Sequence, residues 1–166
     1  MGDTTVTFLG SGDVFGSGGR LQTCIHVDTD SSTFLIDCGA SSMPAMKKQG
    51  VDPNDIEMIF ITHLHGDHFG GLTYFVLDAQ HASKRTEPIT IVGPPGTKAR
   101  VKRAMDAMVP NLWDVDQRFE IRFLEYESGV ETTVNGVELR PYEVLHACGD
   151  PPHALRLETD GTAIGY

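Results

Sequence analysis

The chain has 166 residues, 40% of them hydrophobic and 22% charged, which is typical of a protein that folds around its own core. No apolar run approaches the roughly 20 residues needed to cross a bilayer, and the amino terminus lacks the pattern of an export signal, so we expect a cytoplasmic protein without membrane contact. The formal net charge of −10 repels polyanions, so nucleic acid is not expected as a partner.

The first part of the chain predicts antiparallel β-structure. Apolar patterns predict strands over 5–10, 23–28 and 33–39, and a glycine-rich loop lies at 10–19. The glycine spacing of that loop is not that of a dinucleotide-binding fingerprint. A short helix over 42–49 is expected to end at Gly50, and an apolar strand follows over 56–61.

The rest of the chain predicts helices between strands and then strands alone. Helical spacing predicts helices over 69–82 and 97–108, on either side of a strand over 89–93. Further strands are predicted over 118–126, 130–134, 137–146, 153–158 and 162–166, with tight hairpins at Asn135-Gly136 and Asp160-Gly161. This order predicts an α+β protein, one domain over residues 1–166, with helices on one outer face of a mixed sheet.

The segment THLHGDHFGG, residues 62–71, carries the most specific chemistry. It places His63, His65, Asp67 and His68 within six residues, directly after a predicted strand. Residues two apart do not share a helix face, so these side chains are expected to converge on a loop. Imidazole nitrogens with a carboxylate suit zinc, manganese or iron better than calcium or magnesium, and zinc is the first expectation.

Two more residues are candidates for the same site. His146 closes the predicted strand 137–146, where a metal ligand would be held on a rigid element. Asp37 ends FLID before a glycine and is expected to accept a hydrogen bond from the N–H of a ligating imidazole. His26, His81 and His153 are expected to be surface or packing residues.

Taken together, THLHGDHFGGL, LIDCG, IVGPPGT and VLH resemble the metallo-β-lactamase superfamily, nearest the branch of ribonuclease Z and phosphodiesterase-like hydrolases. The resemblance implies an αββα sandwich of two mixed sheets with two zinc ions at one edge. It implies that His63, His65 and His146 bind the first ion, and that Asp67 and His68 belong to the second. Asp67 is also expected to hold the attacking water and accept its proton as the catalytic base.

The same resemblance implies that a C-terminal portion of the domain is missing. Superfamily members normally continue past the strand that resembles TAIGY to a bridging aspartate and a last histidine, which this sequence does not contain. The tRNA-binding arm of ribonuclease Z also finds no counterpart, so tRNA processing is not expected.

The expected function is a metal-dependent hydrolase that acts on a phosphodiester in a small-molecule ester substrate. Two alternatives stay open at this point: a truncated or split half-domain that binds one metal without catalysis, and a thioester or lactone hydrolase. A homo-oligomer or a complementing chain is the expected protein partner, because apolar strands without a covering layer tend to associate.

Overall fold

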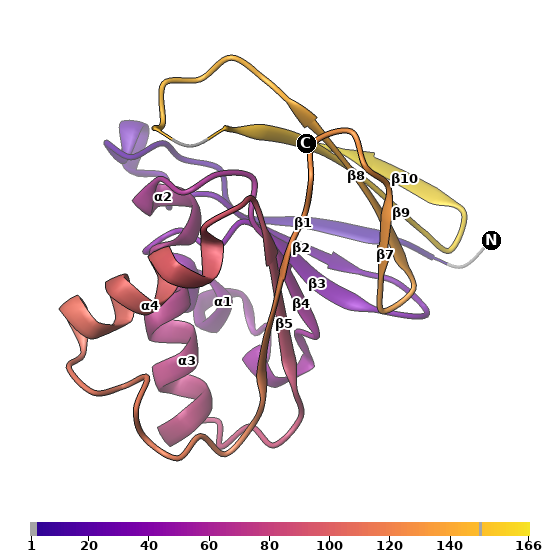
Figure 1. Ribbon diagram of the computed structural model, residues 1–166. Helices are drawn as coiled ribbons and strands as arrows, with labels where there is room; N and C mark the ends of the chain where they lie inside the picture. Colours follow the sequence, from indigo (N-terminus) through magenta and orange to yellow (C-terminus); the bar gives the residue numbers. More distant parts are fainter. Residues whose placement is uncertain (1–2, 150) are drawn as a thin grey trace.

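The structure, a computed structural model, describes residues 3–149 and 151–166 as two stacked β-sheets with helices on one outer face (Figure 1). The first sheet runs in the order β1 (Thr5–Gly10), β2 (Cys24–Asp28), β3 (Thr33–Ile36), β4 (Met58–Phe60), β5 (Ile89–Gly93) and β6 (Ile121–Glu125). Strands β1 to β3 pair antiparallel, and β3 to β6 pair parallel. The ends of the parallel strands therefore meet at one edge of the sheet.

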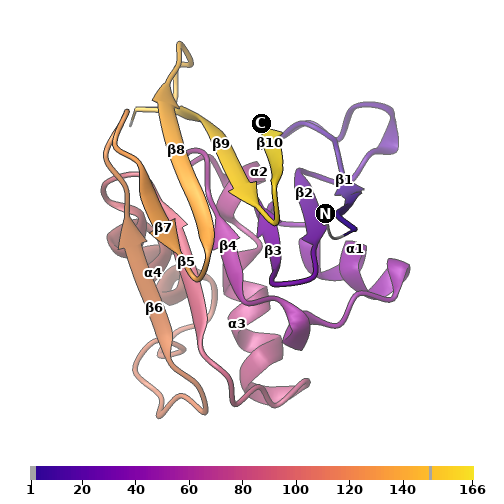
Figure 2. The same cartoon turned by 90° about the vertical axis from the view of Figure 1, so that its right-hand side faces the viewer.

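The second sheet is antiparallel throughout and runs in the order β10 (Thr162–Gly165), β9 (His153–Thr159), β8 (Val137–Glu143) and β7 (Thr132–Val134). Its two hairpins turn where the sequence predicts them, and Asn135 and Asp160 adopt the positive φ angles of 44° and 49° that such turns require. Figure 2 looks onto the outer face of this sheet, which no helix among the described residues covers.

Three helices cover the outer face of the first sheet: α1 (Ser42–Gln49), α3 (Leu72–His81) and α4 (Thr97–Met108) (Figure 1). A single helical turn, α2 (Gly66–Phe69), precedes α3, and short 3₁₀ turns lie at η1 (Ser17–Gly19) and η2 (Pro53–Asp55). The helix predicted over 69–82 corresponds to α3, whereas Phe69 ends the turn α2 before Gly70-Gly71. Among the described residues, no helix is long and apolar enough to cross a membrane.

The buried apolar side chains form two clusters, one on each face of the first sheet. Leu35 and Ile59 pack with Phe75 beneath the helices, whereas Phe34 and Phe60 pack against the second sheet. Because β3 and β4 are covered on both faces, their sequences are continuously apolar instead of alternating. The predicted α+β fold is confirmed, with most strand ends within a few residues of the predictions. Of the αββα sandwich that the resemblance implies, the described residues form both sheets and one helical layer, and the second sheet is antiparallel instead of mixed.

Phe34 provides a test of the packing between the sheets. Its side chain is 0% exposed and lies edge-on to Phe60, with ring centroids 5.3 Å apart. We expect Phe34→Ala to lower the free energy of unfolding by about 3–5 kcal/mol, measured in urea, because the substitution leaves a cavity. Phe8→Ala is the matched control, since Phe8 is 63% exposed on β1, and its change should stay below about 1 kcal/mol. Equal losses in the two variants would contradict this account of the core.

Candidate metal centre

The histidine segment begins where β4 ends, at the edge where the parallel strands finish. The N–H of Ile61 still donates to the carbonyl of Val92 at 2.7 Å, which extends the sheet pairing beyond β4. The hydroxyl of buried Tyr126 donates to the carbonyls of Ile61 at 2.9 Å and Thr62 at 3.2 Å. The main chain just before His63 is therefore held from both sides.

Three of the predicted ligands converge at this edge. His63, His65 and His146 each offer a ring nitrogen, and these nitrogens all lie within 4.8 Å of one another. The ring of His63 lies 4.9 Å from the rings of both His65 and His146, and Nδ1 of His65 is 3.2 Å from Nε2 of His146. Such a group of imidazoles is a donor set that suits a divalent transition metal.

The hydrogen bonds around His63 leave one of its nitrogens free for a metal. Thr62 Oγ1 lies 3.0–3.1 Å from the carboxylate oxygens of Asp37, so its single proton is donated there. It can then only accept from Nδ1 of His63, at 3.0 Å. Nε2 of His63 carries no proton in this tautomer, and it is buried without a hydrogen-bond partner among the described residues.

This unpartnered nitrogen fits the proposed metal site. A buried polar atom without a partner costs about 1–3 kcal/mol, so an electron-pair acceptor at that position accounts for its presence. The pKa of His63 is lowered to about 4, first by burial and then by the charges of His68, His65 and His146. His63 therefore stays neutral at physiological pH, as a metal ligand must.

Asp37, directly after β3, anchors the histidine segment through hydrogen bonds. Its side chain is fully buried, and its main chain has a φ of +58°, a conformation that is uncommon outside glycine. The carboxylate accepts the N–H of Thr62 at 2.9 Å and lies 2.6 Å from Nδ1 of His68. The imidazole contact that the sequence predicts for Asp37 is thus present, and its partner is His68.

Asp37 and His68 shift each other's protonation. Burial raises the pKa of the Asp37 carboxyl, while the hydrogen bond and charge of His68 oppose that rise. Burial lowers the pKa of His68, but the hydrogen bond and charge of Asp37, together with the charge of Asp67, outweigh burial and raise the pKa above its ordinary value. The negative charge of Asp37 therefore favours protonation of His68, and a protonated His68 favours the ionised form of Asp37.

Asp67 and His68 lie beside the three histidines, in α2. Nε2 of His68 is 3.5 Å from a carboxylate oxygen of Asp67, and the His68 ring lies 4.0 Å from that of His63. Neither residue belongs to the group whose nitrogens converge, so their predicted role at a second metal stays a prediction.

Two glycines allow the segment to lie close to the end of β3. The N–H of Cys38 donates to the carbonyl of His68 at 2.6 Å, and that of Gly71 donates to the carbonyl of Cys38 at 2.8 Å. A Cβ atom on Gly39 would collide with the carbonyl of Asp67, and one on Gly71 with the carbonyl of Gly39. Larger residues at either position would separate Asp37 from the histidines.

The expected position of His146 at the end of a strand is wrong. Strand β8 ends at Glu143, and one further main-chain bond joins the N–H of Val144 to the carbonyl of Pro152 at 3.0 Å. Pro151 and Pro152 have no N–H to continue the ladder, so pairing stops before His146. His146 reaches the other histidines from an exposed connection.

Two cavities adjoin the histidines. One of about 640 Å³ is lined by residues 11–14 of the glycine-rich loop and by His65, Asp67, His68 and His146. A second, of about 230 Å³, extends from His63 and His146 towards His153 and Tyr166. The glycine-rich loop therefore borders the site, and the larger cavity has the size of a small-ligand pocket.

Sequence reasoning missed two residues that support the site, Thr62 and Tyr126. Thr62 carries a local signal, since a hydroxyl directly beside the histidines can join their hydrogen bonds. Tyr126 carries none, because it is 65 residues away from Ile61 along the chain. His153, expected to be a surface or packing residue, is buried with its ring centroid 5.1 Å from that of Tyr126, and its main-chain N–H donates to the carbonyl of Thr62.

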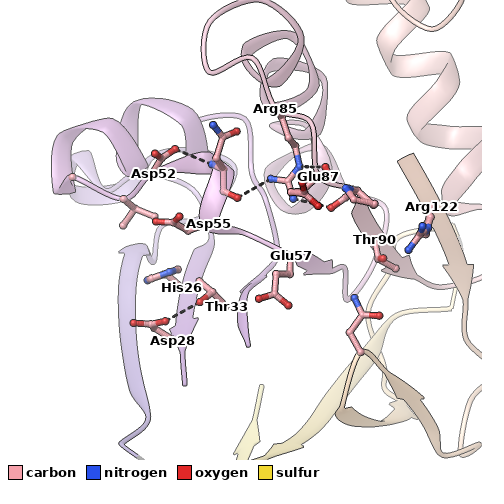
Figure 3. Close-up of a pocket in the computed structure, with 15 residues that line it drawn as sticks. His26, Asp28, Thr33, Asp52, Asp55, Glu57, Arg85, Glu87, Thr90 and Arg122 are labelled. Carbon is pink, nitrogen blue, oxygen red and sulfur yellow. Dashed lines mark hydrogen bonds between the residues drawn. The ribbon is translucent and has the colours of Figure 1, made fainter. Parts of the chain in front are cut away.

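A cavity of about 780 Å³ lies near the starts of the parallel strands, away from the group of His63, His65 and His146 (Figure 3). Five carboxylates line it: Asp28, Asp52, Asp55, Glu57 and Glu87. Arg85 is buried in its wall, and its guanidinium donates to the main-chain carbonyls of Pro53, Asn54, Ile56, Glu87 and Pro88. Arg85 thus joins the segments 53–56 and 87–88 through hydrogen bonds to their main chain. In the described part of the chain, the group of His63, His65 and His146 is the one whose geometry could hold a metal ion.

Comparison with known proteins places the chain in a family. A family model described as "Anti-Pycsar protein Apyc1" matches residues 4–164. Ribonuclease Z of Agathobacter rectalis is 35% identical over 143 residues, which are 86% of this chain and 45% of that protein. The chain thus spans less than half the length of this relative.

Solved structures confirm the fold. Human tRNase Z, short form, superposes with a TM-score of 0.76 at 24% identity, over 98% of this chain and 68% of that one. A metallo-β-lactamase fold protein from Bacillus subtilis superposes with a TM-score of 0.71 at 15% identity, over 98% of this chain and 62% of that one. The chain therefore has the metallo-β-lactamase fold.

The expectation that nucleic acid is not a partner, and that the substrate is a small-molecule ester, is wrong. The relatives are named ribonuclease Z and tRNase Z, after the RNA on which they act. The reasoning failed because a net charge of −10 sums over the whole chain, whereas a phosphate senses charges within a screening length of about 8–10 Å. Within that distance, a bound metal ion can be the largest charge that acts on the phosphate.

Removing either central histidine tests the metal centre. We expect His63→Ala and His65→Ala to lose stoichiometric zinc, measured by elemental analysis after gel filtration, because each removes a donor from the three-histidine group. His81→Ala, at the exposed end of α3, is the control and should keep its metal. Full metal content in the first two variants would refute the site.

The Asp37–His68 pair can be tested without metal. In metal-free protein, the pKa of His68, followed by NMR, should lie above the ordinary value of about 6.5 for histidine. It should fall in Asp37→Asn, because the negative charge that opposes the effect of burial is then removed. Asp78→Asn removes a carboxylate on α3 that pairs with Lys47 and should leave the pKa of His68 unchanged. A pKa that does not respond to Asp37→Asn would show that the hydrogen bond carries no weight.

Proposed function

We propose that this chain, which belongs to the family of anti-Pycsar protein Apyc1 in the ribonuclease Z-like branch of the metallo-β-lactamase superfamily, is a metal-dependent hydrolase of phosphodiesters. The observations that carry the proposal are the convergence of His63, His65 and His146 and the buried Nε2 of His63, which has no hydrogen-bond partner among the described residues. Because the chain spans 45% of its bacterial relative, the activity of the full-length relative supports the proposal without settling it.

The proposed cofactor is zinc, with manganese or iron as alternatives that suit the same nitrogen donors. His63, His65 and His146 would hold the first ion, and Asp67 with His68 would contribute to a second. A bound ion of this kind supplies Lewis acidity to a phosphoryl oxygen and makes a water molecule acidic enough to ionise near neutral pH.

The residues of the chain have separate tasks in this proposal. Asp67 lines the larger cavity and accepts the proton of the attacking water. Asp37 binds Nδ1–H of His68, which turns Nε2 of that ring towards Asp67. Thr62 fixes the tautomer of His63 in the same way. These contacts position the imidazoles before a substrate arrives, so less reorganisation is needed.

RNA is the first substrate class to test. The relatives are named for RNA cleavage, and the cavity of about 640 Å³ beside Asp67 is open to a phosphate carried on a larger molecule. We propose a cytoplasmic location for the protein, as its sequence predicts.

One observation favours a second candidate function. The metal-binding group of the described residues has three members, all histidines, and this suffices for one ion. A half-domain that binds one metal without catalysis therefore stays a candidate. A thioester or lactone hydrolase has no such support in the structure.

Asp67→Asn tests the proposed base. With metal present, the substitution should lower kcat for a short RNA or for bis(p-nitrophenyl) phosphate by about 10²–10⁴-fold, with little change in KM, because the proton acceptor is lost. Removal of metal by a chelator should abolish turnover, and added zinc should restore it.

The same assays include a control variant and test the half-domain alternative. His81→Ala should keep wild-type kcat. One equivalent of metal per wild-type chain, without turnover of either substrate, would favour the half-domain over the hydrolase.

A further inference from the structure

Positive charge is concentrated on helix α4. Four of the 13 lysines and arginines of the chain stand at 98–103, and no acidic residue occurs on the helix before Asp106. Lys98, Lys102 and Arg103 are exposed. In a chain with a net charge of −10, the first two turns of this helix therefore form a local basic surface.

Helix α4 begins at the edge of the first sheet that carries the histidine segment. Strands β4 and β5 are parallel, so the segments that follow them, with α2 and α4, start at the same edge (Figure 1). The carboxylate of Glu125 accepts the N–H of Lys98 at 3.0 Å. The next residue, Tyr126, donates its hydroxyl to the carbonyl of Thr62 at 3.2 Å. Two hydrogen bonds thus connect the start of the helix with the main chain before the histidines.

The stability of the helix does not account for these charges. The N-terminal end of a helix dipole is positive, so a lysine in the first turn, as at position 98, is unfavourable. Lys98 and Lys102 are four positions apart, which places two like charges side by side. The ion pairs of the described residues include neither lysine, nor Arg103. Residues that break a local rule in this way are expected at functional sites.

We propose that Lys98, Lys102 and Arg103 bind the phosphate backbone of the RNA whose scissile phosphate lies at the histidines. This inference rests on the proposed function and names the surface that holds its substrate. Lysine and arginine bind phosphates whatever the base sequence, so this surface positions the strand without selecting it. The cavity beside the histidines is lined by the carboxylates of Asp13 and Asp67, which repel further phosphates, whereas α4 attracts them.

Trp113 restrains one of the three side chains. Nζ of Lys102 lies 5.5 Å from the centroid of the Trp113 ring, within the range of cation–π attraction. The Trp113 ring lies 5.9 Å from that of Phe123, on β6. A lysine that is already restrained loses less conformational freedom when it binds a phosphate. Lys102 is therefore partly preorganised for an anion.

The salt dependence of RNA binding tests the proposal. The zinc-loaded chain is titrated into a labelled oligoadenylate of about 20 nucleotides at about 50 to 200 mM salt. The triple variant Lys98→Gln/Lys102→Gln/Arg103→Gln should reduce the slope of log Kobs against log salt by about 2, because each phosphate contact on a single strand contributes about 0.7. At about 0.1 M salt its binding should be about 100-fold weaker than that of wild type.

Two further variants separate the surface from overall charge and from misfolding. Lys47→Gln/Lys48→Gln/Lys84→Gln removes three exposed lysines outside α4, with the same change in net charge, and should keep the wild-type slope. Lys98→Arg/Lys102→Arg/Arg103→Lys retains the three charges on α4 and should bind like wild type.

Several outcomes would overturn the proposal. It is wrong if both glutamine variants reduce the slope equally, if the α4 glutamine variant binds like wild type, or if wild type does not bind the oligoadenylate. Binding of wild type to phosphatidylserine vesicles, but not to the RNA, would assign the basic surface to a membrane instead.

The surface and the proposed hydrolase fail separately, because electrophoresis of the same samples reports whether the RNA is cleaved. Binding that requires the α4 charges, with RNA left intact by the zinc-loaded chain, would refute the hydrolase and leave the surface in place. Cleavage of the RNA, with binding unchanged in the α4 glutamine variant, would refute the surface alone.

Discussion

The arrangement of the site depends on the buried carboxylate of Asp37. It lies at the end of β3 and accepts hydrogen bonds from Thr62, after β4, and from His68, in α2. Burial of a carboxylate without partners would cost several kcal/mol, and these hydrogen bonds offset that cost. The same contacts set the tautomers of two histidines. Stability of the sheet edge and orientation of the ligands therefore have one physical cause.

The local parts of this arrangement can be predicted from sequence. His63, His65, Asp67 and His68 stand within six residues after an apolar strand, and Asn135-Gly136 marks its hairpin. Both signals are short-range and follow from backbone geometry. That residues 1–166 form one domain stays a prediction, and so do the ligand roles at a second metal.

The parts that escaped prediction depend on contacts distant in sequence or on main-chain bonding. Tyr126, directly after β6, donates a hydrogen bond to the main chain before His63, and nothing near it in the sequence indicates this contact. The sequence predicts a strand to His146 because apolar residues continue to Leu145, but β8 ends at Glu143, since Pro151 and Pro152 lack the N–H groups that would continue the ladder. The expectation that nucleic acid is not a partner is wrong for a related reason, because the net charge of the chain does not indicate where the charged residues lie.

The distance along the chain between His65 and His146 has a thermodynamic consequence. These residues are 81 positions apart, one beyond the first sheet and one beyond the second. An ion bound by both would act as a cross-link that closes a long loop. In the unfolded chain, closing a loop of that length removes much conformational entropy, so a bound ion would penalise unfolding as a disulfide does. Zinc would then be a structural clasp between the sheets as well as a cofactor.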